Sequence, residues 1–298
     1  MALIQDGGSH GGGNQLYVYR VGGVDRLLKV YRRRGGLVGE WIKGLSHRFF
    51  ERKRGVSATA RRETERLGLE IWRRHGFDVP VLSHDPPPPE FSRFPTLWLE
   101  YCPGPSVADV FEEPTTEPAR RHELLSSVSE RMSRRHELAL ELGEALLIPE
   151  HASIKHVIVF GDRLVQIDLE GGFRPGLPVL EAACQEVSGT LRSVARKAEA
   201  EFEGLVDTFV QSYSNSAQLA LIAEHGSTGR GTYRTFKRWQ DGRRRDHYSK
   251  TGMFDAILSR LQRSASAAVD TALGRDPRRL GENDRLPRPA VVDPDLRR

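Results

Sequence analysis

The chain has 298 residues, of which 38% are hydrophobic and 29% charged, and its formal net charge is +5. This length fits one two-lobed domain or two ordinary domains, and this composition can bury a core. Two cysteines are too few for a disulfide framework or a zinc cluster, and no stretch reaches the roughly 18 to 20 apolar residues of a membrane span. These counts exclude a collagen, a coiled coil, a small secreted disulfide-stapled domain and an integral membrane protein.

The charge is carried mainly by arginine, because only seven of the 45 basic residues are lysines. Arginine binds phosphate and carboxylate groups bidentately, so an anionic partner is one interpretation. An arginine-rich genome gives the same composition, and that alternative stays open. The first residues lack a basic region followed by an apolar run, so we expect no cleaved secretory signal and a cytoplasmic location.

The N-terminal third alternates between short apolar runs and turn residues. Residues 7–13 are rich in glycine, and we expect a flexible entry there. LYVYRV (16–21) and RLLKVY (26–31) flank a Gly-Gly turn and predict an antiparallel hairpin. Residues 57–75 predict a helix that Ser57 caps and Gly76 ends.

The rest of the chain predicts two more strands followed by a mainly helical part that contains a second hairpin. We expect strands over VPVL (79–82) and TLWLEY (96–101), helix over about 117–145, and further helices from 180 to 224. VIVF (157–160) and LVQIDL (164–169) flank Gly161-Asp162 and predict a second hairpin. Three stretches carry little apolar pattern: the basic segments 32–55 and 228–249, and a tail from 274 that we expect to be disordered.

Lys29 and Asp168 are the residues that point to chemistry. Lys29 lies in the middle of an apolar strand, where a charge is costly unless it is paired. In kinases a strand lysine holds the nucleotide phosphates and is positioned by a helix glutamate, and the following helix offers Glu63, Glu65 and Glu70. Asp168 closes an apolar strand, where a carboxylate can hold Mg²⁺. An edge-strand lysine and a turn aspartate are the alternatives without function.

Together these segments resemble the lipopolysaccharide inner-core sugar kinases, the WaaP and Kdo-kinase group, which are relatives of the RIO-type atypical protein kinases. The matching features are KVYRRRGGLVG (29–39), ERLGLEIWRRHGFDVPVL (65–82), WLEYCPGPSV (98–107) and the IKHVIV and VQIDLE runs near 154–170. The resemblance implies an α+β, bilobal, protein-kinase-like fold with a small antiparallel-sheet N-lobe and a mainly helical C-lobe. It implies an N-lobe over 1–102, a C-lobe over 103–224, a basic helical extension over 225–273 and a tail over 274–298.

The resemblance also implies roles for individual residues. Glu65 becomes the better partner for Lys29, with Glu63 as the second choice. The hinge backbone around Glu100, Tyr101 and Cys102 would bind adenine. His156 stands where most kinases have the metal-binding asparagine, so His156 and Asp168 would bind the metal.

The position of the catalytic aspartate is the departure from the family pattern. Counting back five residues from His156 gives His151, and in the other register His151 is the motif histidine and Ser153 takes the aspartate position. Neither register supplies a carboxylate, although Glu150 is adjacent. An imidazole can accept a hydroxyl proton near neutral pH, so His151, with Lys29 and Asp168, is the predicted catalytic set.

The resulting prediction is a kinase that uses ATP and Mg²⁺ and phosphorylates an inner-core lipopolysaccharide sugar, Kdo or heptose. Its partner would be an anionic lipid-linked sugar or a protein substrate, with peripheral contact at the cytoplasmic face of the inner membrane. A RIO-like serine/threonine kinase and a pseudokinase that acts as a binding module are the alternatives. A nucleic-acid partner rests on charge alone and ranks last.

Overall fold

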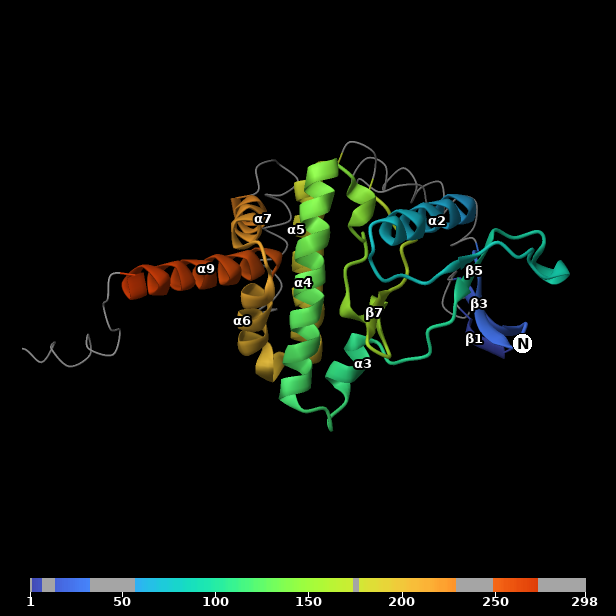
Figure 1. The fold of residues 1–298 in the computed structure, drawn as a ribbon, viewed down its shortest axis with the longest axis horizontal. Helices are drawn as coiled ribbons and strands as arrows, with labels where there is room; N and C mark the ends of the chain where they lie inside the picture. The colour runs from blue at the N-terminus through green and yellow to red at the C-terminus, as the bar shows by residue number, and fades with distance from the viewer. Residues whose placement is uncertain (1, 7–13, 33–56, 174–176, 229–248, 273–298) are drawn as a thin grey trace, which may run out of the picture.

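The computed structural model describes residues 2–6, 14–32, 57–173, 177–228 and 249–272. The chain forms an α+β fold with two unlike parts: a small antiparallel sheet with one long helix beside it, and a larger body of helices (Figure 1). The predicted fold class is therefore confirmed. Within the described residues, no helix combines the length and the apolar composition needed to span a bilayer.

The sheet has five strands in the order β1-β2-β3-β5-β4. Their bounds are Ala2–Asp6 for β1, Gln15–Val21 for β2, Val24–Val30 for β3, Leu82–Ser83 for β4 and Thr96–Glu100 for β5. The hairpin of β2 and β3 is the predicted one, and its Gly22 and Gly23 have φ of 59° and 83°, which a two-residue hairpin turn requires. Antiparallel pairing of β3 with β5 then places Lys29 opposite Leu97.

The two faces of the sheet explain how a lysine comes to lie in an apolar strand. Leu28 and Val30 point to one face, where they pack with Tyr17, Phe91 and Trp98. Because side chains alternate along a strand, Lys29 points to the opposite face. That face also carries Tyr31, Leu97 and Leu99, which belong to the large core shared with the helices. Lys29 is therefore buried at the junction of the two parts of the molecule.

The helical elements and the second hairpin have clear local signals. The α-helices of the described residues are α2 (Ala58–Arg74), α3 (Val107–Glu112), α4 (Pro118–Leu142), α5 (Val179–Lys197), α6 (Phe202–Ser212), α7 (Ser216–Thr228) and α9 (Lys250–Ala272). The Ser57 side chain caps α2 by accepting from the backbone N–H of Ala60. Strands β6 (Val157–Phe160) and β7 (Arg163–Gln166) form the predicted hairpin.

Two sequence-based expectations about elements need correction, and one strand was not expected. The stretch 79–82 is strand only from Leu82, and the second hairpin ends at Gln166, two residues before Asp168. The expected flexible entry is preceded by a strand, β1, which pairs with β2 through a bulge and leaves Leu3 half exposed. The sequence of β1, ALIQD, is three apolar residues followed by two polar ones, so it lacks the alternation that predicts a half-buried strand.

The expected boundary between residues 224 and 225 falls inside α7. After it, α9 buries Met253, Phe254 and Ile257 in the same core as α5 and α6. The glycine-rich stretch 7–13, most of both basic segments and the tail from 273 lie outside the described residues.

Candidate active site

Lys29 lies at the centre of a buried cluster of carboxylates. Its Nζ is 2.7 Å from Glu65 Oε2, 2.9 Å from Asp168 Oδ1 and 3.4 Å from Glu170 Oε2. Burial by itself would lower the pKa of Lys29, but the charges of Asp168, Glu65 and Glu170 outweigh it and raise that pKa. Lys29 is therefore a permanent cation that joins three separate segments of the chain.

Glu65 reaches this cluster from the middle of α2. Its carboxylate is buried, and it accepts a hydrogen bond of 2.5 Å from the Tyr31 hydroxyl in addition to the contact with Lys29. Burial raises the pKa of Glu65. The alternative partner, Glu63, lies on the exposed side of α2 and pairs with Arg66 at 2.6 Å. Of the three glutamates that the sequence offers on this helix, Glu65 is the one that contacts Lys29.

Asp168 follows β7 in an unusual backbone conformation. Its φ is 62°, and no other non-glycine residue in the described ranges has a positive φ. Such conformations cost free energy and concentrate at functional sites. The side chain is 30% exposed. Burial would raise the pKa of Asp168, but the adjacent Lys29 ammonium holds it well below its usual range, so the carboxylate stays ionised.

His156 faces the second oxygen of Asp168. Its Nδ1 lies 3.0 Å from the carbonyl oxygen of His151, and since a carbonyl only accepts, Nδ1 donates. Burial lowers the pKa of His156, so the ring is neutral and Nε2 carries a lone pair. This Nε2 lies 3.6 Å from Asp168 Oδ2.

That arrangement has the chemistry of a cation site. A lone pair and a carboxylate oxygen repel each other at close range, and a metal ion or a proton between them removes the repulsion. Asp168 also shares a compact set of ligand atoms with Glu65 and Glu170, all within 4.8 Å of one another. The exposed oxygens of Asp168 suit Mg²⁺, which prefers carboxylate oxygens completed by water or phosphate.

A second ionic link joins α2 to the Asp168 loop, and sequence reasoning missed it. Glu170 is buried and contacts Arg61 at 3.3 Å. Asn14 bridges them, because its amide donates to Glu170 and its Oδ1 accepts from Arg61 at 2.7 Å. A signal was present: Arg61 lies four residues before Glu65, which places both on the same face of a helix.

His151 lies beside a carboxylate that sequence reasoning noted only as a neighbour. Its Nε2 is 3.3 Å from Glu150 Oε2; the Glu150 side chain is buried and that of His151 is 42% exposed. Gly171 packs directly against this pair, since a Cβ at Gly171 would lie 2.3 Å from Glu150 Oε2. The Asp168 loop and the His151 segment are thus in contact, and a larger side chain at Gly171 would displace the Glu150 carboxylate.

The predicted hinge residues connect the sheet to α3. Glu100 ends β5 and pairs with Arg163 at 2.6 Å, which ties the hinge to the second hairpin. Cys102 is half-buried, and burial raises the pKa of its thiol to about 11, so it stays protonated. Tyr101 and Cys102 lie between β5 and α3 in the chain.

The structure therefore brings Lys29, Glu65, Asp168 and His156 into one cluster, and the His151 carbonyl accepts from His156. The arrangement can hold a cation at Asp168 while Lys29 faces the same space.

Comparisons with known proteins find distant similarity to solved structures. No family model matches the sequence, and no curated protein matches it. Among solved structures, the chain is similar to one described as WaaP in complex with acyl carrier protein, at 13% identity and a TM-score of 0.43, over 87% of this chain and 88% of that one.

Proposed function

We propose that this protein is a kinase-like phosphotransferase that uses ATP with a divalent cation. The observation that supports it most is the position of Lys29, whose ammonium contacts Glu65 of α2 and Asp168 after β7 at 2.7 and 2.9 Å. Phosphoryl transfer needs positioning and charge neutralisation more than covalent help from the protein. A cation and a metal-binding carboxylate that converge between the two parts of the molecule supply both.

Each residue of the cluster has a role in this proposal. Lys29 holds the nucleotide phosphates, and Glu65 fixes Lys29 in place. Asp168 and His156 hold Mg²⁺, which when bound neutralises charge on the phosphate oxygens. Glu100, Tyr101 and Cys102 receive adenine through their backbone. The Arg61–Glu170 pair keeps α2 and the Asp168 loop together.

The Glu150–His151 pair takes the place of the missing catalytic aspartate. A buried carboxylate beside one ring nitrogen orients the imidazole and stabilises its protonated form, as in other carboxylate–histidine pairs. The exposed edge of His151 is then free to accept a proton from an acceptor hydroxyl. The alternative is a pseudokinase that binds nucleotide without transferring phosphate, and the absence of an aspartate at this position motivates it.

The proposed acceptor comes from the sequence resemblance. The runs at 29–39 and 65–82 resemble the inner-core lipopolysaccharide kinases, so a Kdo or heptose sugar on an anionic lipid at the cytoplasmic face of the inner membrane is the first candidate. A serine or threonine side chain of a protein is the second.

Transfer of the γ-phosphate from radiolabelled ATP tests the proposal. We expect the parent protein to label a lipid-linked sugar acceptor or to release phosphate in the presence of Mg²⁺. His151→Ala should lose about 10² to 10⁴ in rate while still binding ATP, the usual range for loss of a general base. Glu63→Gln is the control and should keep the parent's rate, because Glu63 lies on the same helix as Glu65 but outside the cluster. A parent protein that binds ATP and transfers nothing to sugar, lipid or protein would establish the pseudokinase.

A further inference from the structure

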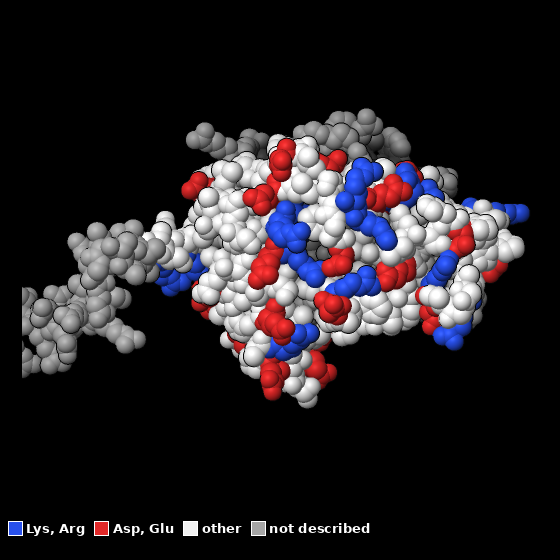
Figure 2. Space-filling model, viewed as in Figure 1, with Lys and Arg blue, Asp and Glu red and all other residues white. Residues whose placement is uncertain are grey.

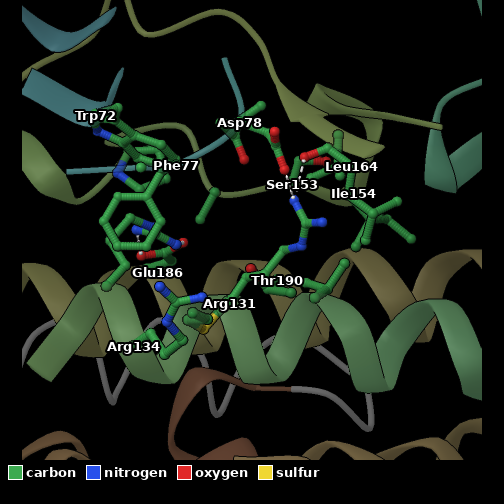
Figure 3. A pocket seen from close by; sticks show the side chains of 18 residues that line it. Trp72, Phe77, Asp78, Arg131, Arg134, Ser153, Ile154, Leu164, Glu186 and Thr190 are labelled. Carbon is green, nitrogen blue, oxygen red and sulfur yellow. Dashed lines mark hydrogen bonds and ion pairs between the residues drawn. The ribbon is translucent and has the colours of Figure 1, made fainter. Parts of the chain in front are cut away.

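A cavity of about 160 Å³ lies behind the His151 segment, between α2 and α4 (Figure 3). Among the residues that line it are Trp72, Phe77, Arg131, Arg134, Ser153 and Thr190. On the face that α4 crosses, basic and acidic side chains are interspersed around a small hollow (Figure 2). A water molecule needs only about 10 to 15 Å³ of such volume, so this rear cavity has room for a small organic molecule.

The charges around the rear cavity do not balance. Arg131 pairs with Asp78 at 2.5 Å, and Arg135 pairs with Glu186 at 2.8 Å. Arg134 is exposed, and within the described part of the chain it has no carboxylate at ion-pair distance. Its guanidinium instead lies 6.0 Å from the centre of the Phe77 ring. The rim therefore carries one arginine, Arg134, whose guanidinium N–H groups can bind an acidic ligand.

The uncharged wall next to Arg134 is aromatic. Phe77 and Trp72 meet edge to face, with their ring centres 5.9 Å apart. In the close view, Arg134 rises from α4 toward Phe77, and Arg131 points away from them to Asp78 (Figure 3). A flat apolar group can lie against these rings while an acidic group meets the guanidinium, which binds planar carboxylates bidentately.

The rear cavity and the candidate active site share the same structural elements. Ala152, Ser153 and Ile154 form one wall of the cavity, directly after Glu150 and His151. Gly76, Phe77 and Asp78 continue from α2, the helix that carries Glu65. Leu164 and Gln166 belong to β7, which leads to Asp168.

We propose that the rear cavity is a binding site for a small aromatic carboxylate, with the acid group on Arg134 and the ring against Phe77. The site is separate from the nucleotide site, because the segment 149–154 stands between them. Through the shared elements, its occupancy alters nucleotide affinity, and the nucleotide alters affinity for the carboxylate by the same factor. This last step rests on the proposed function.

Calorimetric titration with benzoate tests the binding site directly. We expect benzoate to bind the full-length protein, and the uncharged isostere benzamide to bind at least tenfold more weakly, because a charged hydrogen bond is lost. Arg134→Gln should weaken benzoate by at least tenfold. Arg120→Gln, an exposed arginine of the same helix outside the cavity, should leave it unchanged. Circular dichroism checks that both variants are folded.

Two results would overturn the site: no benzoate binding to the parent, or equal binding to the parent and Arg134→Gln. Repeating the titration with saturating ATP and Mg²⁺ tests the coupling, and a benzoate affinity unaltered by bound nucleotide would refute it. Failure of the proposed function looks different, since ATP then fails to bind, or binds without phosphate transfer, while the benzoate results stand.

Discussion

Two buried ionic clusters in this protein are built in different ways. In the helical part, Arg135 pairs with Glu186 at 2.8 and 2.5 Å, and His136 contacts the same carboxylate at 2.8 Å. Its charges balance, and all three side chains are buried. At the junction with the sheet, three carboxylates surround Lys29 and Arg61, which leaves one negative charge in excess.

The difference separates a structural cluster from a candidate functional one. The charges of the helical cluster balance one another, and its groups serve to fix α4 against α5. The junction cluster has a partly exposed carboxylate, Asp168, on strained backbone, with a neutral imidazole facing it. An excess of negative charge that opens toward solvent is what a cation requires. The contrast predicts that the first cluster governs stability and the second governs binding.

Glu186→Ala is expected to have the largest effect on stability. It leaves Arg135 as a buried charge without its partner, which costs about 3 to 5 kcal/mol. Urea unfolding at neutral pH measures this change. A loss below 1 kcal/mol would mean that the helical cluster is not structural and would remove the contrast.

Acidification should destabilise the protein through the same cluster. Burial would raise the pKa of Glu186, but Arg135 lowers it to about 2, below the usual 4.5. The ionised Glu186 therefore stabilises the fold above about pH 4.5, and this contribution, about 3 kcal/mol, is lost as the pH falls toward 2. Burial also lowers the pKa of His136 below its ordinary 6.5, so the fold favours the neutral ring. The contribution of His136 to the free energy of unfolding therefore declines as the pH falls below 6.5.

Urea unfolding between pH 7 and pH 3 measures both steps. Stability that stays flat over this range would contradict the assignment of an ionised Glu186 and a neutral His136.

Tyr31→Phe should have a moderate effect on the junction cluster. It removes the hydroxyl that donates to Glu65 and should cost about 1 to 2 kcal/mol, since Glu65 keeps its contact with Lys29. Tyr19→Phe is the matched control, because its hydroxyl bonds Glu90 at the surface at 3.2 Å. Equal losses in the two variants, by thermal unfolding, would show that burial of the acceptor does not matter.

The smallest effect is expected at an exposed pair. Arg20 contacts Asp25 at 2.9 Å across the first hairpin, and the Arg20 side chain is 71% exposed. Arg20→Ala should alter the unfolding free energy by less than about 0.5 kcal/mol, because water and salt screen such pairs. A larger loss would mean that the number of ion pairs, and not their burial, determines how much each cluster contributes to stability.

Much of the junction cluster follows from local sequence signals. The position of Lys29 in the middle of an apolar strand predicted that its charge would be paired, and the helix pattern predicted the span of α2. The contacts of Glu170 with Arg61 and Asn14 join positions 109 or more residues apart, and no local periodicity records them. Local periodicity also does not predict the pairing of Glu186 with Arg135, which lie 51 residues apart. The positive φ of Asp168 is likewise set by tertiary contacts, because aspartate has only a weak preference for that conformation.

Calorimetric titration of the full-length protein with ATP, with and without Mg²⁺, shows whether the junction cluster binds nucleotide and metal together. We expect that binding depends on Mg²⁺ and that Asp168→Asn, which removes the metal-binding charge, weakens it by at least about a hundredfold. ATP affinity that is the same with and without Mg²⁺, and the same in Asp168→Asn, would show that the junction cluster is not a nucleotide–metal site.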